Sequence, residues 1–150
     1  AATMQVGLLL AGHDLWPYAE RAFDQAAVLG KPFPEALAYL GLARDKQGKD
    51  GSAPMEQAFA LAPDNAQVLY LLGLHRRSVY DYAGSLDNFV NAVAADTTNP
   101  AYAAELSTAY RLVGDLENAE KWLKTAVTLS NDDPRFQELL SAFYADLNNN

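Results

Sequence analysis

The feature that most constrains the fold of this chain is an internal repeat. Residues 70–74, Tyr-Leu-Leu-Gly-Leu, closely echo residues 38–42, Ala-Tyr-Leu-Gly-Leu, and a third copy begins at Pro100, where Leu106 takes the leucine position. A fixed period of about 20 to 50 residues is the signature of architectures built from stacked supersecondary units. The repeat therefore predicts an array of similar units.

Each unit is predicted to be a helix, a tight turn and a second helix. Pro34, Pro100 and Pro134 open helices, because the missing N–H of proline costs nothing in a first turn and its φ is already helical. Gly48 and Gly114 stand where a helix must end, since glycine readily takes a positive φ. We expect helix pairs over 3–11 with 15–29, 34–46 with 52–62, 66–78 with 82–95 and 100–112 with 116–129, then a closing helix over 134–147.

Composition narrows the class of function. The 150 residues are 50% hydrophobic and 20% charged, with a formal net charge of −8, as in a soluble globular domain. An acidic surface repels phosphate backbones, so nucleic-acid binding is not expected. The chain has no cysteine, which leaves a cytoplasmic or a periplasmic location equally open. Its longest apolar stretch, residues 6–11, is far shorter than the roughly 18 to 20 residues that cross a bilayer, so no membrane insertion is expected.

The sequence carries no motif of an enzyme, a cofactor site or a metal site, such as a P-loop, a dinucleotide fingerprint or an EF-hand loop. Residues 48–52, Gly-Lys-Asp-Gly-Ser, lack the glycine spacing and the preceding strand of a phosphate loop, and are expected to form an ordinary turn. His13 and His75 fall in different units with no second ligand at helical spacing. We expect His13 in a turn and His75 to serve packing or to lie on the surface. We therefore expect no catalysis and no cofactor.

The spacing of the repeated residues resembles the tetratricopeptide repeat, in which an aromatic residue is followed by Leu-Gly, Tyr, a turn glycine, a small residue, an aromatic, alanine and proline over about 34 residues. Residues 100–133 match this pattern best, and the Leu-Gly pair recurs at 40–41 and 72–73. Small residues at a helix crossing let two backbones approach closely. Alanine holds such a place in each second helix, at Ala26, Ala58, Ala92 and Ala126.

The sequence also departs from that pattern. Arg44 and Arg76 stand at the tyrosine position, the second unit is short between Gly48 and Pro54, and the first unit matches only in its second helix. The resemblance still covers nearly the whole chain. It implies an all-α fold, a right-handed superhelical α-solenoid of antiparallel helix pairs. This single array would span residues 1–150, with units over about 1–33, 34–65, 66–99 and 100–133 and the closing helix over 134–147.

In this family the first helices of successive units line a concave groove, which implies a site on this chain. Arg77 and Arg111 occupy the same place one unit apart and would hold an acidic group of a partner. The alternative is that the two arginines form ion pairs within the array, with Asp45, Glu105 or Asp81, and that the aromatic residues pack between units. The same register also places Ala38 and Leu71 in the groove. The principal groove candidates are Tyr39, Leu42, Asp45, Tyr70, Leu74, Arg77, Thr108 and Arg111.

The resemblance implies a scaffold that binds a protein or peptide partner, as a helix or an extended segment, in this groove. The clamp with which some members capture acidic chaperone tails is absent, because Ala38, Leu42 and Tyr70 hold several of its positions. Two alternatives are a bacterial chaperone or assembly factor for a secretion or pilus system, and a regulatory appendage of an enzyme domain outside this segment.

Both end helices are broadly apolar, whereas terminal units of repeat arrays ordinarily carry a polar outer face. Residues 6–11 read Val-Gly-Leu-Leu-Leu-Ala, and large apolar residues form a stripe on the last helix. We therefore expect that the chain is a segment of a longer repeat protein or that it self-associates through an end. The stripe consists of Phe136, Leu139, Leu140, Phe143, Tyr144 and Leu147.

Overall fold

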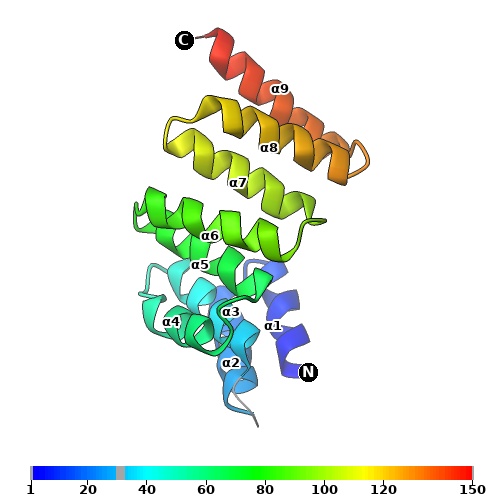
Figure 1. Cartoon of the computed structure of the whole chain (residues 1–150). Coiled ribbons are helices and arrows are strands. Elements are labelled where there is room, and N and C mark those ends of the chain that lie inside the picture. The colour runs from blue at the N-terminus through cyan, green and yellow to red at the C-terminus, as the bar shows by residue number, and fades with distance from the viewer. Residues whose placement is uncertain (1, 30–32, 150) are drawn as a thin grey trace.

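The computed structural model describes residues 2–29 and 33–149. In this part of the chain nine α-helices and no strand occur, and the helices stack in order from one end of the molecule to the other (Figure 1). The predicted all-α solenoid is confirmed, and the predicted helix ends differ from the observed ones by no more than one residue. The helices are α1 (Ala2–Gly12), α2 (Trp16–Val28), α3 (Pro34–Asp45), α4 (Ser52–Leu61), α5 (Ala66–Ser78), α6 (Tyr82–Ala95), α7 (Pro100–Leu112), α8 (Leu116–Leu129) and α9 (Pro134–Asn148).

The helix ends form for the reasons that the sequence indicates. Pro34, Pro100 and Pro134 each begin a helix, as predicted. Gly48 and Gly114 lie in turns with φ of +70° and +85°, a region that residues with a Cβ seldom adopt. Asparagine and aspartate side chains accept hydrogen bonds from free N–H groups at the start of five helices. These caps are Asn65, Asp81, Asn99, Asp115 and Asp133.

In the first three units the two helices of a unit cross at a glycine of the first helix. A Cβ added to Gly7 would lie 2.5 Å from the ring of Phe23, and one added to Gly73 would lie 2.9 Å from the ring of Phe89. The fourth unit has Ser107 at this place, and its hydroxyl donates a 2.6 Å hydrogen bond to the carbonyl of Ala119 on α8. The prediction that the first unit matches only in its second helix is therefore wrong, because Gly7 gives α1 the same crossing.

The second unit reaches the same crossing with a shorter turn. A Cβ on Gly41 would lie 2.5 Å from the side chain of Met55, and Gly51 packs directly against the backbone of Gly41. The N–H of Gly51 donates a 3.0 Å hydrogen bond to Oδ1 of Asp45, which closes the turn before α4. Residues 48–52 thus form the interhelix turn expected from the sequence. The shortening brings a glycine to the crossing, where a larger residue would separate the helices.

Each second helix packs both on its own first helix and on the first helix of the next unit. In one core cluster Ala19 and Phe23 of α2 contact Leu40 of α3, and in another Phe89 of α6 contacts Leu106 of α7. These clusters repeat along the array, so the core is a continuous series of interfaces between neighbouring helices.

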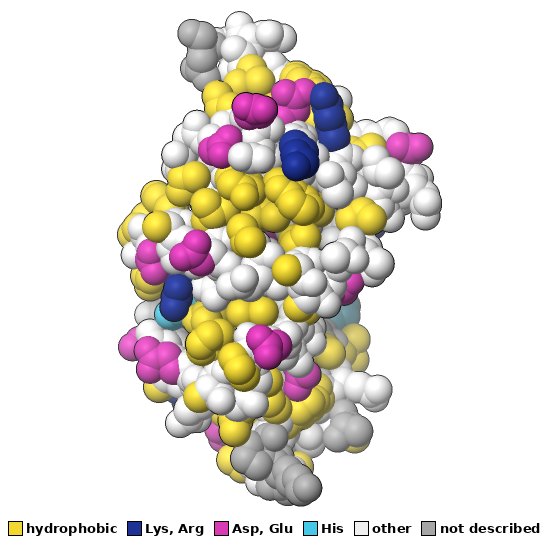
Figure 2. All heavy atoms as spheres, viewed as in Figure 1, with side chains coloured by type: hydrophobic (Ala, Val, Ile, Leu, Met, Phe, Trp, Pro, Cys, Tyr) yellow, Lys and Arg dark blue, Asp and Glu magenta, His cyan; other side chains and the backbone are white. Residues whose placement is uncertain are grey.

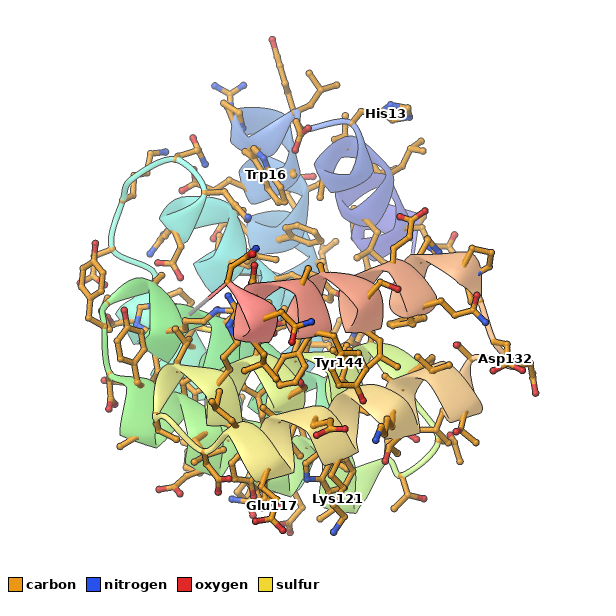
Figure 3. All side chains as sticks on the ribbon, turned by 90° about the horizontal axis from the view of Figure 1, so that it is seen from above. His13, Trp16, Glu117, Lys121, Asp132 and Tyr144 are labelled. Carbon is orange, nitrogen blue, oxygen red and sulfur yellow. The ribbon has the colours of Figure 1, made fainter. Side chains whose placement is uncertain are left out.

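The two end helices differ from the inner ones in exposure. On α9 Phe143 is buried against α8, whereas Leu139, Tyr144 and Leu147 are partly exposed. The side chain of Tyr144 lies between α9 and α8 (Figure 3), and its hydroxyl donates a 2.5 Å hydrogen bond to Glu120. On α1, Val6 and Leu9 are exposed. Self-association through these ends stays a prediction.

Within residues 2–29 and 33–149, no helix is both long and apolar enough to cross a membrane.

Candidate functional site

The eight groove candidates all lie on the first helices α3, α5 and α7. The same helical register also predicted that Ala38 and Leu71 lie in the groove. This prediction is wrong, because both residues are fully buried in the core of the second unit. Position along a first helix therefore identifies the groove side only approximately.

The two groove tyrosines are half-buried and contact their neighbours. The ring of Tyr39 stacks on Phe23 with 5.2 Å between centroids, and its hydroxyl accepts a 2.7 Å hydrogen bond from Gln67 of the next first helix. The ring of Tyr70 stacks on Tyr102 with 4.8 Å between centroids. Burial raises the pKa of Tyr39, and it raises the pKa of Tyr70 to about 12 with a smaller contribution from the charge of Glu105. Both tyrosines thus join adjacent units and offer only part of their surface to a ligand.

The apolar strip between the tyrosines is also partly used by the core. Leu42 and Leu74 are half-buried, and both pack against the cluster that contains Met55 and Leu72. Both leucines remain partly accessible to solvent. The strip is therefore only partly available to a ligand.

Asp45 is bound within the array. Its Oδ2 lies 2.7 Å from Nδ1 of His75 on α5, and its Oδ1 accepts the N–H of Gly51. Nε2 of His75 lies 3.2 Å from the hydroxyl of Ser52 at the start of α4. His75 was expected either to pack or to lie on the surface, and the structure shows it buried, where its hydrogen bonds connect α3, α4 and α5. Sequence reasoning missed the link, since its members are separated by up to 30 residues.

Arg77 pairs with Glu105, one of the three internal partners that the sequence suggested. Its Nη1 lies 2.5 Å from Oε2 of Glu105 on α7, and the guanidinium lies 5.9 Å from the ring centroid of Phe89. The two charged side chains are 27% and 28% exposed. Arg77 therefore connects the third and fourth units, and its charge is already balanced.

Arg111 stands in a more open setting at the end of the array. Its Nη1 lies 3.2 Å from Oδ2 of Asp146 on α9, and the two side chains are 53% and 59% exposed. A hollow of about 190 Å³ lies beside it between α7 and α9. This hollow brings exposed Thr108 and Arg111 together with Leu139 and Phe143. Among the groove candidates, these two have the most accessible polar groups.

The array also has hollows between successive second helices. One of about 620 Å³ lies between α2 and α4, and one of about 700 Å³ lies between α4 and α6. The second contains Asn88, whose Oδ1 is buried without a hydrogen-bond partner. Figure 2 shows hydrophobic side chains interspersed with acidic ones on one face of the molecule. Acidic side chains are thus spread over this face of the molecule.

The described residues contain no group of three His, Cys, Asp or Glu side chains that would hold a metal ion. His13 lies in the turn after α1 and points away from the other labelled residues (Figure 3), in agreement with the sequence expectation.

No protein-family model matches the sequence, and no curated protein matches it. Among solved structures, the chain is similar to a thermophilic TPR protein of Thermus thermophilus, with a TM-score of 0.84 and 19% identity over 97% of this chain and 81% of that chain. It is similar to MamA of Desulfovibrio magneticus, with a TM-score of 0.75 and 19% identity over 98% of this chain and 84% of that one. It is also similar to a chain of the APC/C hetero-tetramer Cut9–Hcn1, with a TM-score of 0.83 and 20% identity over 98% of this chain and 30% of that chain.

The stacked helix pairs place the chain in the class of helical-repeat folds. Its particular fold is the tetratricopeptide-repeat fold, so the resemblance drawn from the sequence is confirmed at the level of fold.

Proposed function

We propose that this protein is a non-enzymatic scaffold that binds a peptide segment of a partner protein on its concave side, with the hollow between α7 and α9 as the principal contact. The supporting observation is the geometry around Arg111. Its guanidinium and the carboxylate of Asp146 are both more than half exposed, and exposed ion pairs contribute little to stability. A carboxylate of a ligand can therefore replace Asp146 at small cost.

The lining of the hollow indicates the chemistry of the ligand. Leu139 is exposed at its edge and Phe143 forms part of its floor, so an apolar side chain of the ligand would be buried there. Arg111 provides a planar donor for a nearby acidic side chain. The favoured ligand is a peptide with an acidic residue close to a leucine or an aromatic residue. The similarity to a chain of a hetero-tetramer agrees with a role in joining proteins.

The proposal is tested by selecting binders from a random peptide library displayed on phage and measuring their affinity by fluorescence anisotropy. Thr108→Glu places a carboxylate in the hollow, where it repels an acidic ligand and competes for Arg111, and should weaken binding at least about tenfold. Thr128→Glu on α8 is the matched control. Thr108 and Thr128 are both exposed, and each donates its hydroxyl to a carbonyl four residues earlier. Equal binding by the two variants would refute the assignment.

Ser52, His75 and Asp45 have the connectivity of a hydrolase triad, and we propose that they have no catalytic role. The Ser52 hydroxyl donates a 2.5 Å hydrogen bond to Oδ1 of Asp50, whereas Nε2 of His75 lies 3.2 Å away, so the hydrogen of Ser52 is directed to a carboxylate and not to the imidazole. The hydrogen bonds of His75 with Asp45 and Ser52 join α3, α5 and α4, which gives them a structural role. Hydrolysis of p-nitrophenyl acetate should be the same for the native protein and Ser52→Ala, and a loss of activity in the variant would contradict this.

A further inference from the structure

The side chain of Asn88 on α6 is buried with an unmet hydrogen-bonding group. It is 5% exposed, and its Oδ1 has no hydrogen-bond partner among the described residues. A buried acceptor without a donor costs free energy, so native proteins seldom keep one unless it has a use. The amide of Asn88 therefore indicates a place where a donor from another molecule would be bound.

Packing within the array does not require an asparagine at this place. The four units can be aligned on the small residue at which the second helix crosses the first, and the residue three positions later can then be compared. The crossing residues are Ala19, Gly51, Ser85 and Ala119, and the compared residues are Ala22, Pro54, Asn88 and Trp122. Three of the four units thus have an apolar side chain where α6 has an amide.

Asn88 lies in the hollow of about 700 Å³ between α4 and α6, which we name the α4–α6 hollow. Two carboxylates lie in the same hollow, those of Asp87 on α6 and Asp64 in the turn between α4 and α5. Both residues are exposed, and neither side chain forms an ion pair or a hydrogen bond with another described residue. The α4–α6 hollow therefore combines three side chains with oxygen acceptors that are not paired within the described part of the chain.

The charge of the α4–α6 hollow favours a cation. Arg76 is the only basic residue among the described residues that line it, and its Nε lies 4.0 Å from Oδ2 of Asp81. A Cβ added to Gly84 would lie 2.8 Å from Nη1 of Arg76, so this guanidinium lies against the start of α6. The ring of Phe59 also lines the hollow and is 39% exposed. Aromatic faces attract cations, which adds to the effect of the two carboxylates.

We propose that the α4–α6 hollow binds the side chain of an arginine from a peptide segment of a partner protein. A guanidinium has five N–H donors and no acceptor, and it pairs well with carboxylates such as Asp64 and Asp87. Its aliphatic stem can lie on Phe59. The χ2 torsion of asparagine has a broad energy profile, so the amide of Asn88 can turn its oxygen to the bound donor. The hollow is separate from the one beside Arg111, so the inference does not rest on the proposed function.

The probe is the blocked peptide acetyl-Ala-Ala-Arg-Ala-Ala-amide, titrated into the isotopically labelled protein and followed in amide NMR spectra. We expect saturable shifts of the side-chain amides of Asn88 and Asn91, because both residues line the hollow. The same peptide with citrulline in place of arginine keeps the shape and loses the charge. It should bind at least about tenfold more weakly, the usual loss of a hydrogen bond to a charged group. A lysine peptide should also bind more weakly, because an ammonium is more strongly hydrated.

Asn88→Leu removes the acceptor and keeps a side chain of similar size. This variant should weaken binding of the arginine peptide at least about tenfold. Its midpoint of urea denaturation should be equal to or higher than that of the native protein, because the unpaired acceptor is no longer buried. An asparagine with a purely structural role would instead give a lower midpoint and unchanged binding.

Asp87→Asn tests the charge at an exposed position, and it keeps the proposal testable if Asn88→Leu does not fold. It should weaken binding of the arginine peptide. Glu117→Gln on α8 is the matched control, because Glu117 is also an exposed carboxylate of a second helix and lies outside the α4–α6 hollow. This control should bind the peptide like the native protein.

Four results would overturn the proposal. The arginine peptide could cause no saturable shift at the α4–α6 hollow, or the citrulline peptide could bind as tightly. Asp87→Asn and Glu117→Gln could bind the arginine peptide equally well. Equal affinity for the lysine peptide would refute the assignment to a guanidinium.

Discussion

Asp45 and Arg111 occupy the same position of two different units, but they differ in how deeply their ion pairs are buried. Asp45 reaches the next first helix through His75, and these side chains are only 14% and 9% exposed. Arg111 reaches α9 through Asp146, and both of these side chains are mostly exposed. Arg77 and Glu105 lie at the equivalent place between them and are intermediate in exposure. The side chains at this position therefore become more exposed from the second unit to the fourth.

The largest expected loss of stability is at the most buried pair, His75 and Asp45. His75→Ala leaves the carboxylate of Asp45 without its side-chain partner, and should lower the free energy of unfolding by about 2 kcal/mol. Urea denaturation followed by circular dichroism measures it. The double variant with Asp45→Ala should lose less than the sum of the single variants, because the two residues act on the same interaction. Additive losses would show that the hydrogen bond does not couple α3 to α5.

Tyr70 lies close to Arg77 and Glu105, and its contribution to stability should change at high pH. Its pKa is raised to about 12 in the folded state by burial, against about 10 in an unfolded chain. The neutral phenol therefore stabilises the fold fully below pH 10, and this contribution is lost as the pH rises through 12. Tyr70→Phe should reduce the loss of stability between these values by up to about 2 kcal/mol. Thermal melts at several alkaline pH values test this, and parallel curves for the two proteins would refute it.

Arg77 should have an intermediate effect. Arg77→Ala removes the ion pair with Glu105 and the contact with Phe89, and should cost about 1 kcal/mol, because both charged groups retain contact with solvent. Urea denaturation at low and high salt measures the change. A cost as large as that of His75→Ala would mean that exposure does not rank these pairs.

Arg111 should have the smallest effect on stability. Arg111→Ala should change the free energy of unfolding by less than about 0.5 kcal/mol, as for most exposed pairs, while it weakens binding of selected acidic peptides. Stability and peptide binding, measured on the same Arg111→Ala variant, show whether Arg111 differs in role from Asp45. A large loss of stability with unchanged peptide binding would make Arg111 a structural residue like Asp45.

The fold could be predicted from the sequence, but how deeply each groove candidate is buried could not. Gly41, Gly73 and the helix-opening prolines follow from local rules on small residues and backbone angles. Asp45 and Arg111 look alike to those rules, because both are charged residues at the same point of a first helix. Their difference comes from the neighbours, a histidine 30 residues later in one case and an aspartate of the closing helix in the other. Pairings between distant residues carry no periodic signal.

The exposed pair at the end of the array also has a consequence for motion. Helix α9 contacts the rest of the protein mainly through α8, and its ion pair with α7 is open to water. In a repeat array each helix is stabilised by its neighbours, so the end with fewer partners opens at lower free energy. Amide hydrogens of α9 should therefore exchange with deuterium sooner than those of α5 and α6. The hollow beside Arg111 would then widen and close on the time scale of that opening, so the proposed binding site would lie in the part of the molecule that is easiest to deform.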